Sequence, residues 1–144
     1  MYRGLAGAFI VKPKVDPFPS GLGDTALFIS DLRIAPDGKF PPNTGDDWVN
    51  GREGDHVLVN GQKRPVMTLA PGSSRRLRLF NACNARYLRL AFEGHRMTLV
   101  ATDGGLIPEP MAGMEDILLS PGERAEVVVD FRTAAGRVLL NALP

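Results

Sequence analysis

The sequence contains few of the side chains that build metal centres or nucleophilic active sites. Among 144 residues there is one cysteine, Cys83, and there are two histidines, His56 and His95. A single cysteine excludes a disulfide within the chain and leaves the redox compartment open. No apolar run approaches the roughly 18 residues of a spanning helix, so we expect no membrane span. Residues 1–11 are apolar but lack the basic start and cleavage pattern of a signal peptide.

The sequence also lacks an excess of either charge, because 17 basic and 16 acidic residues give a formal net charge of +1. This balance gives no electrostatic reason to expect nucleic acid or an anionic membrane as a partner. One basic stretch nevertheless spans positions 75–96. Its arginines either line the polar faces of strands or form a basic docking patch. They are Arg75, Arg76, Arg78, Arg86, Arg89 and Arg96.

Glycine and proline, by contrast, are frequent, with 16 and 12 residues. They separate short runs rich in β-branched and aromatic residues, which is typical of an all-β sandwich or barrel. The length suits one domain, and no helix longer than two turns is expected. The expected strands are 7–11, 25–34, 56–61, 64–69, 76–81, 87–92, 97–101, 116–120, 125–131 and 137–141.

The dipeptide Asn60-Gly61 is the strongest turn signal in the chain. Both residue types tolerate the positive φ that a type I′ turn requires. We therefore predict a hairpin in which 56–61 pairs with 64–69.

Two other features are interpreted structurally. Asp103, Gly104 and Gly105 follow a predicted strand, and they favour a turn over a calcium or phosphate site. The polar segment 40–54 is expected to be a surface loop. Trp48 is its expected anchor, because an indole buries well at the edge of a core.

A copper centre can be tested on spacing alone. Blue-copper sites use two histidines, a thiolate and usually a weak axial methionine, and all these donor types occur here. In such sites a histidine and then the axial ligand follow the cysteine at short fixed intervals on one loop. Here the fifth and tenth residues after Cys83 are Leu88 and Glu93, and neither is a histidine or a methionine. The spacing therefore does not fit a copper site. We interpret His56 and His95 as partly exposed loop residues. Cys83 is interpreted as a small buried residue, not a nucleophile, because no neighbouring base is recognisable.

Several ordered motifs resemble the second cupredoxin domain of multicopper oxidases, in particular the bacterial laccase-like and cuprous oxidase group. They are the segments 79–86, 101–110 and 118–131, the pairing of 24–31 with 54–61, and the opening segment 2–11. The motif and turn positions that we single out within and beside them are Asn60, Gly61, Asn81, Asn84, Arg86, Asp103, Gly104 and Gly105.

The resemblance implies a copper-free Greek-key β-sandwich cut from a larger extracytoplasmic, periplasmic protein. Residues 1–12 would close the preceding domain, 13–24 would form a linker, and 25–144 would form the second cupredoxin-like domain. The partners would be the first and third cupredoxin domains, which carry the copper, so no copper ligand maps onto this chain. Candidates for packing against those domains are Leu5, Phe9, Phe18 and Leu22.

Three functions follow as hypotheses. The first is a non-catalytic middle domain of an oxidase that couples substrate oxidation to reduction of oxygen to water. The second is the middle domain of a copper-less relative that acts as a periplasmic scaffold. The third is a separate carbohydrate- or protein-binding sandwich, which predicts a clustered aromatic platform. Trp48, Tyr2 and Tyr87 are far apart in sequence, which weakens the third hypothesis.

Overall fold

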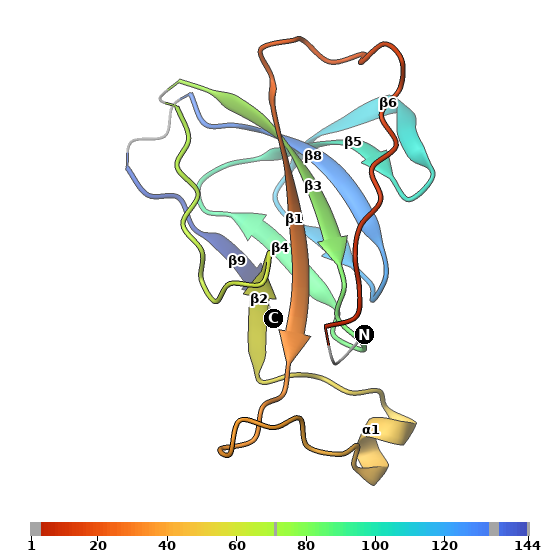
Figure 1. The fold of residues 1–144 in the computed structure, drawn as a ribbon. Coiled ribbons are helices and arrows are strands. Elements are labelled where there is room, and N and C mark those ends of the chain that lie inside the picture. The colour runs from red at the N-terminus through yellow and green to blue at the C-terminus, as the bar shows by residue number, and fades with distance from the viewer. Residues whose placement is uncertain (1–3, 71, 133–135, 144) are drawn as a thin grey trace.

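Two β-sheets pack face to face in the computed structural model, which describes residues 4–70, 72–132 and 136–143 (Figure 1). A six-stranded sheet has the order β2-β1-β3-β8-β5-β6, and a three-stranded sheet has the order β7-β4-β9. This arrangement confirms the predicted all-β sandwich. The elements are β1 (Gly23–Leu32), α1 (Gly45–Val49), β2 (His56–Val59), β3 (Ser74–Asn81), β4 (Leu88–Phe92), β5 (Met97–Thr102), β6 (Gly105–Met114), β7 (Ile117–Leu119), β8 (Arg124–Asp130) and β9 (Leu140–Leu143).

The core lies between the two sheets because apolar residues alternate along the central strands. In β3, Leu77 and Leu79 are fully buried, and Leu77 stands opposite Val127 of β8 in the strand register. Leu90 of β4 and Leu119 of β7 close the core from the smaller sheet. Successive strand residues point to opposite faces, so the residues between these positions lie on the outer face of the large sheet.

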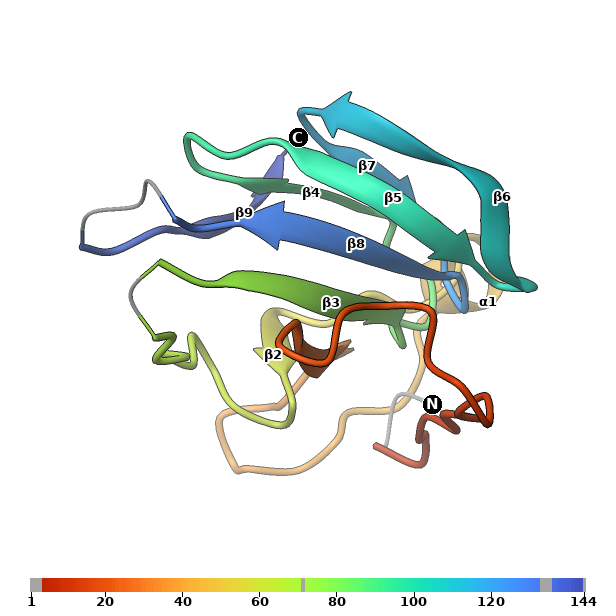
Figure 2. The ribbon, with the colours of Figure 1, turned by 90° about the horizontal axis from the view of Figure 1, so that it is seen from above.

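The chain crosses between the sheets in a Greek-key manner. β1 runs parallel to β3, whereas the other neighbouring pairs among the described strands are antiparallel. The N-terminal segment 4–22 precedes β1 and passes over β3 on the face opposite the smaller sheet (Figure 2). The large sheet is therefore covered on one side by strands and on the other by an irregular segment.

Two predicted strands do not form. Residues 7–11 have no β-structure, because they lie on the surface with no strand partner among the described residues. Residues 64–69 are also irregular: Arg64 has a φ of 52°, and Pro65 lacks the N–H that a ladder needs. β2 pairs instead with β1, from Ile29↔Val59 to Leu32↔His56.

The edge strand β6 is missing from the sequence prediction. Its residues are almost all exposed, it contains Pro108 and Pro110, and its register with β5 shifts twice. An exposed edge strand has no apolar alternation to reveal it, and prolines are tolerated there. The last strand is also displaced, because 137–141 is predicted and β9 occupies Leu140–Leu143.

The loop 40–54 contains the helix α1, and its predicted anchor is wrong. The Trp48 side chain is 77% exposed, whereas Asp47 beside it is buried. Asp47 completes the capping box of the N-cap residue Thr44 and forms an ion pair with Arg33, so polar bonding and not apolar burial holds this loop. α1 has five residues, and no helix in the described ranges is long and apolar enough to cross a membrane.

Candidate functional site

The cysteine and the two histidines, which are the donors of a copper site, lie in different surroundings. Cys83 is fully buried and contacts the Ile29 carbonyl, and desolvation raises the pKa of its thiol to about 12. His56 contacts Lys63 at the start of β2, whereas His95 bonds the Glu93 carbonyl in the β4–β5 turn. Within the described ranges no three His, Cys, Asp or Glu side chains converge on a position that could hold an ion. A copper ion therefore does not fit the donors that the structure describes.

The outer face of the large sheet carries a partly buried ion-pair network. Arg78 of β3 donates two hydrogen bonds to Asp24 of β1, at 2.8 and 2.7 Å, and a third to Glu126 of β8 at 2.6 Å. Arg76 donates to the other oxygen of Glu126 at 2.7 Å. Both arginines are buried, and the Arg78 guanidinium lowers the pKa of Asp24. The network ties three adjacent strands together.

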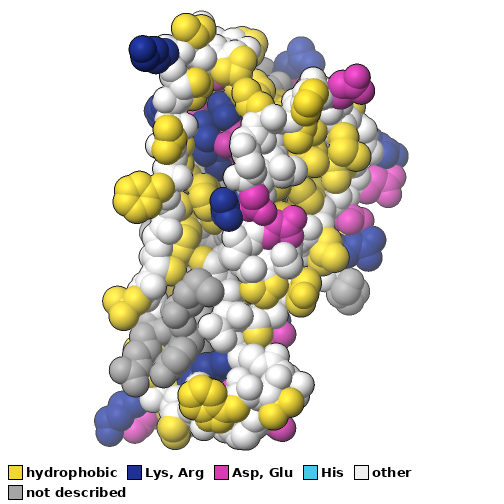
Figure 3. All heavy atoms as spheres, turned by 90° about the vertical axis from the view of Figure 1, so that its right-hand side faces the viewer, with side chains coloured by type: hydrophobic (Ala, Val, Ile, Leu, Met, Phe, Trp, Pro, Cys, Tyr) yellow, Lys and Arg dark blue, Asp and Glu magenta, His cyan; other side chains and the backbone are white. Residues whose placement is uncertain are grey.

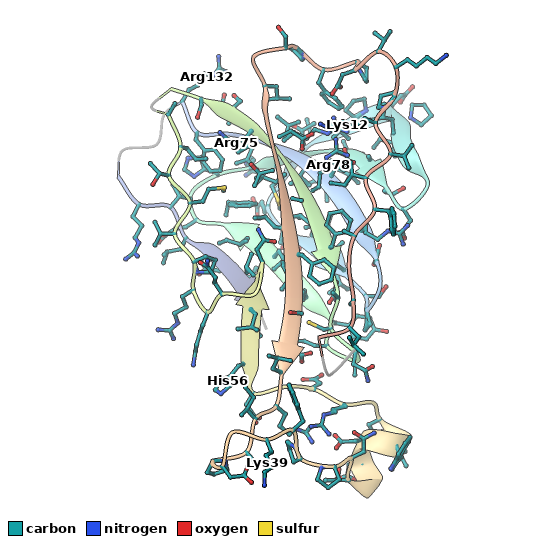
Figure 4. All side chains as sticks on the ribbon, in the orientation of Figure 1. Lys12, Lys39, His56, Arg75, Arg78 and Arg132 are labelled. Atoms are coloured by element: carbon teal, nitrogen blue, oxygen red, sulfur yellow. The ribbon has the colours of Figure 1, made fainter. Side chains whose placement is uncertain are left out.

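The N-terminal segment is attached to this network. The Arg76 guanidinium carbon lies 4.2 Å from the centre of the Phe18 ring, and an Arg76 nitrogen lies 3.5 Å from Asp16. Lys12 and Arg78 project over the same part of β3 in Figure 4, and the charge of Lys12 also lowers the pKa of Asp24. Residues 16–18 therefore rest on the sheet through a cation–π contact and an ion pair.

A shallow groove remains between residues 6–11 and the sheet. Arg78, Phe80 and Arg124 line its sheet side. Basic and acidic side chains lie in the recess, and apolar side chains border it (Figure 3). The predicted packing residues differ in position: Leu5 and Phe9 are 84% and 99% exposed, whereas Phe18 and Leu22 are half-buried.

The predicted basic stretch is not a free positive patch. Arg76 and Arg78 line the outer face of β3, as one of the two alternatives predicts, and they are buried there in the network described above. Arg86, Arg89 and Arg96 form ion pairs with acidic neighbours. Acidic residues distant in sequence neutralise these charges, and nothing in the local sequence of 75–96 signals them.

Asn81 is a bonding centre at the end of β3, with 2% of its surface exposed. Its amide nitrogen donates to the carbonyls of Arg86 and Leu119, at 2.9 and 3.0 Å. Its amide oxygen accepts from the Cys83 backbone N–H at 3.0 Å. Asn81 thus fixes the turn that follows β3 and joins that turn to β7, whereas Asn84 on the same turn is exposed.

Arg86 joins the same turn to the loop before β2. It bonds the Asp31 carboxylate at 3.3 Å and the Gly54 carbonyl at 2.8 Å, while the Gly54 N–H donates to Asp31 at 2.7 Å. A Cβ at Gly54 would overlap the Leu32 backbone, so this close approach requires glycine.

Each of the two turn motifs is bonded to another strand, Asn60 to β1 and Asp103 to β8. The Asn60 side chain exchanges hydrogen bonds with the backbone of Ala26 and Phe28, and Asn60 and Gly61 have φ of 50° and 76°. The Asp103 carboxylate accepts from the Arg124 backbone N–H at 2.8 Å.

The Gly104–Gly105 turn directly follows Asp103. Gly105, at a φ of 112°, starts β6. The Asp103 carboxylate also pairs with the Arg124 side chain at 2.9 Å, so its negative charge already has a partner. Asp103 thus acts in a turn, and Gly105 beside it adopts a positive φ that favours glycine, whereas Gly104 does not.

Comparison with known proteins gives one family. A family model described as multicopper oxidase matches residues 36–142. The chain is 40% identical over 139 residues to a cell division protein FtsP of Dickeya dadantii, and 35% identical over 136 residues to that of Escherichia coli. Each match covers 90% of this chain and 28% of the relative.

Solved structures give the same fold. A multicopper oxidase from Campylobacter jejuni, described as a metallo-oxidase, superposes with a TM-score of 0.86 at 43% identity. That match covers 98% of this chain and 29% of the other. A laccase from Pediococcus acidilactici superposes with a TM-score of 0.72 at 35% identity, over 88% of this chain and 27% of the laccase. The chain thus spans under a third of the length of these proteins.

Proposed function

Because the chain belongs to the multicopper oxidase family, we propose that it is a copper-free middle domain that positions the copper-bearing domains of a longer oxidoreductase. The observation that carries the proposal is a family match over 36–142 in a chain whose described residues hold no convergent set of metal donors. The length comparison supports it, because the chain covers about 28% of its curated relatives.

A rigid sandwich suits the task of a spacer. Metal sites shared between domains keep their geometry only if those domains are held within fractions of an ångström. Here the core is continuous between the sheets, and the network of Asp24, Arg78 and Glu126 ties β1, β3 and β8 on the outer face. Both faces of the large sheet are thereby braced against shear.

The N-terminal segment fits a connection to a preceding domain. We assign 1–12 to the closing strand of that domain, 13–24 to the linker and 25–144 to this domain. Residues 7–11 lack a strand partner among the described residues, and Leu5 and Phe9 are exposed apolar residues. A preceding domain would supply both the partner strand and the apolar cover. Asp16 and Phe18 would hold the linker at its midpoint.

A second candidate is favoured by the curated relatives, which are cell division proteins. In this alternative the longer protein is a copper-less scaffold, and the sandwich positions binding surfaces instead of copper sites. We place either protein outside the cytoplasm, in the periplasm, from the family likeness. A signal sequence in the complete polypeptide would support that location.

Copper content of the complete polypeptide separates the two candidates. The oxidoreductase predicts several copper ions per polypeptide, together with oxygen consumption when a reducing substrate is added. The scaffold predicts neither. A complete polypeptide that contains only this sandwich would contradict both candidates, because no domains would remain for it to position.

A further inference from the structure

The helix α1 presents two large apolar side chains to solvent. Trp48 is 77% exposed and Val49 is 82% exposed. Tryptophan is usually largely buried in folded domains, and exposed aromatic anchors are enriched at protein interfaces. Apolar side chains stand on the surface at the lower end of the molecule, where α1 lies (Figure 3).

Buried polar groups hold this short helix in one position. Arg33 donates to both oxygens of Asp47, at 2.8 and 2.9 Å, and also to the Glu53 carbonyl. Thr44 and Asp47 form a reciprocal capping box, with bonds of 3.2 and 2.8 Å. This bonding lowers the pKa of Asp47 to about 2, mainly through Arg33.

A second arginine bonds to the segment that precedes the helix. Arg52 has 2% of its surface exposed and donates to the Asn43 side chain at 2.8 Å. Separating a buried charged group from its partners would leave an unpaired charge, which is strongly unfavourable. These bonds therefore hold the loop in one conformation. A rigid helix loses little conformational freedom when Trp48 is covered, which favours docking.

The position of the chain ends indicates what covers Trp48. The described chain starts and ends at the end of the sandwich that carries α1 (Figure 1), and along the horizontal axis that Figures 1 and 2 share, the N-terminal end lies nearer to α1 than the C-terminal end does. In a longer polypeptide, the part that precedes the chain therefore emerges from the end of the sandwich that carries α1. The exposed acidic residues Asp46 and Asp55 flank the apolar pair in sequence, whereas the Glu53 carboxylate is already paired with Arg86.

We propose that Trp48 and Val49 dock into the domain that precedes this chain in the same polypeptide, in an apolar pocket bordered by basic side chains. The proposal rests on the middle-domain function and adds a specific contact to it. The contact would fix the angle between the two domains, whereas the attachment of Asp16 and Phe18 limits only the path of the linker.

Hydroxyl-radical footprinting with mass spectrometry tests the contact. We expect the peptide that contains Trp48 to be oxidised roughly fivefold more slowly in the complete polypeptide than in the 144-residue chain, because a docked anchor is shielded from water. The radical dose is matched with an added reporter dye. Equal oxidation rates in the two proteins would overturn the proposal.

A deletion identifies the occupant. Removing the preceding domain from the complete polypeptide should return Trp48 to the oxidation rate of the 144-residue chain. If Trp48 stays protected after the deletion, another part of the polypeptide covers it, and the assignment is wrong. Protection in the 144-residue chain together with sedimentation as a dimer would assign the surface to a second copy and would also overturn the proposal.

Substitutions provide a matched control. Trp48→Ser should leave the melting temperature of the 144-residue chain unchanged and should lower that of the complete polypeptide. Val66→Ser removes another apolar side chain, 74% exposed and distant from α1 in sequence, and should change neither temperature. An unchanged melting temperature of the complete polypeptide with Trp48→Ser would contradict docking. Copper content reports separately on the proposed function, because Trp48 would be covered in either candidate protein.

Discussion

The replacement Asn81→Ala tests the bonding centre between the two sheets. It leaves the Cys83 N–H and the Leu119 carbonyl without their buried partner, and it removes a bond from the Arg86 carbonyl. An orphaned buried polar group costs about 1–3 kcal/mol, so the two buried groups together give a loss of about 3–4 kcal/mol. For a domain of this size that loss lowers the melting temperature by roughly 10 °C.

Urea unfolding followed by circular dichroism measures this loss. The midpoint should fall while the dependence on urea concentration stays the same, because the surface exposed on unfolding does not change. Asn84→Ala is the matched control on the same turn. Its side chain is exposed, so the stability should change by less than about 0.5 kcal/mol. A loss below about 1 kcal/mol for Asn81→Ala would refute the role that we assign to this amide.

Three further predictions concern single residues. Asp47 has a pKa of about 2, below its ordinary 3.8, so the stability that its ionised form contributes is complete above about pH 4 and disappears as the pH falls through about 2. In melting experiments at different pH values, Asp47→Asn should be less stable than wild type at neutral pH. A difference in melting temperature that stays constant down to pH 2 would contradict this. Gly54→Ala should destabilise the chain by about 2–3 kcal/mol in urea unfolding, because the new methyl overlaps the Leu32 backbone. Gly45→Ala, where a Cβ meets nothing within 4 Å, should be neutral, and equal effects of the two changes would argue against the overlap. Cys83 should react with iodoacetamide at about pH 8 at least ~100-fold more slowly in the native chain than in urea, because its thiol is buried and its pKa is about 12; similar rates would show that the thiol is accessible.

The sequence predicts strands correctly where the local pattern of apolar residues agrees with the packing of the fold. The alternation in 76–81 and 125–131 predicted the central strands β3 and β8, because apolar residues at every second position have one buried face available. The turn at Asn60 formed, but its predicted partner 64–69 did not, because Arg64 has a φ of 52° and Pro65 lacks the N–H that a ladder needs.

The candidate site was harder to predict because its contacts join distant segments. From the sequence, Arg78 resembles an exposed strand residue. In the structure it is buried because it bonds Asp24 and Glu126, which lie 54 and 48 residues away in the sequence. Trp48 looked like a core anchor because an indole is apolar, whereas the buried position in α1 belongs to Asp47 through its bonds to Arg33. In both cases a distant charge determined burial, and a single sequence does not show which charges meet.

Copper binding by the purified 144-residue chain tests the central claim most directly. After incubation with copper and dialysis against a weak chelator, elemental analysis should find far less than one copper ion per chain, and the solution should stay colourless. One tightly bound copper ion per chain, with a blue colour that disappears in Cys83→Ser, would contradict the claim that this domain positions copper sites without contributing to them.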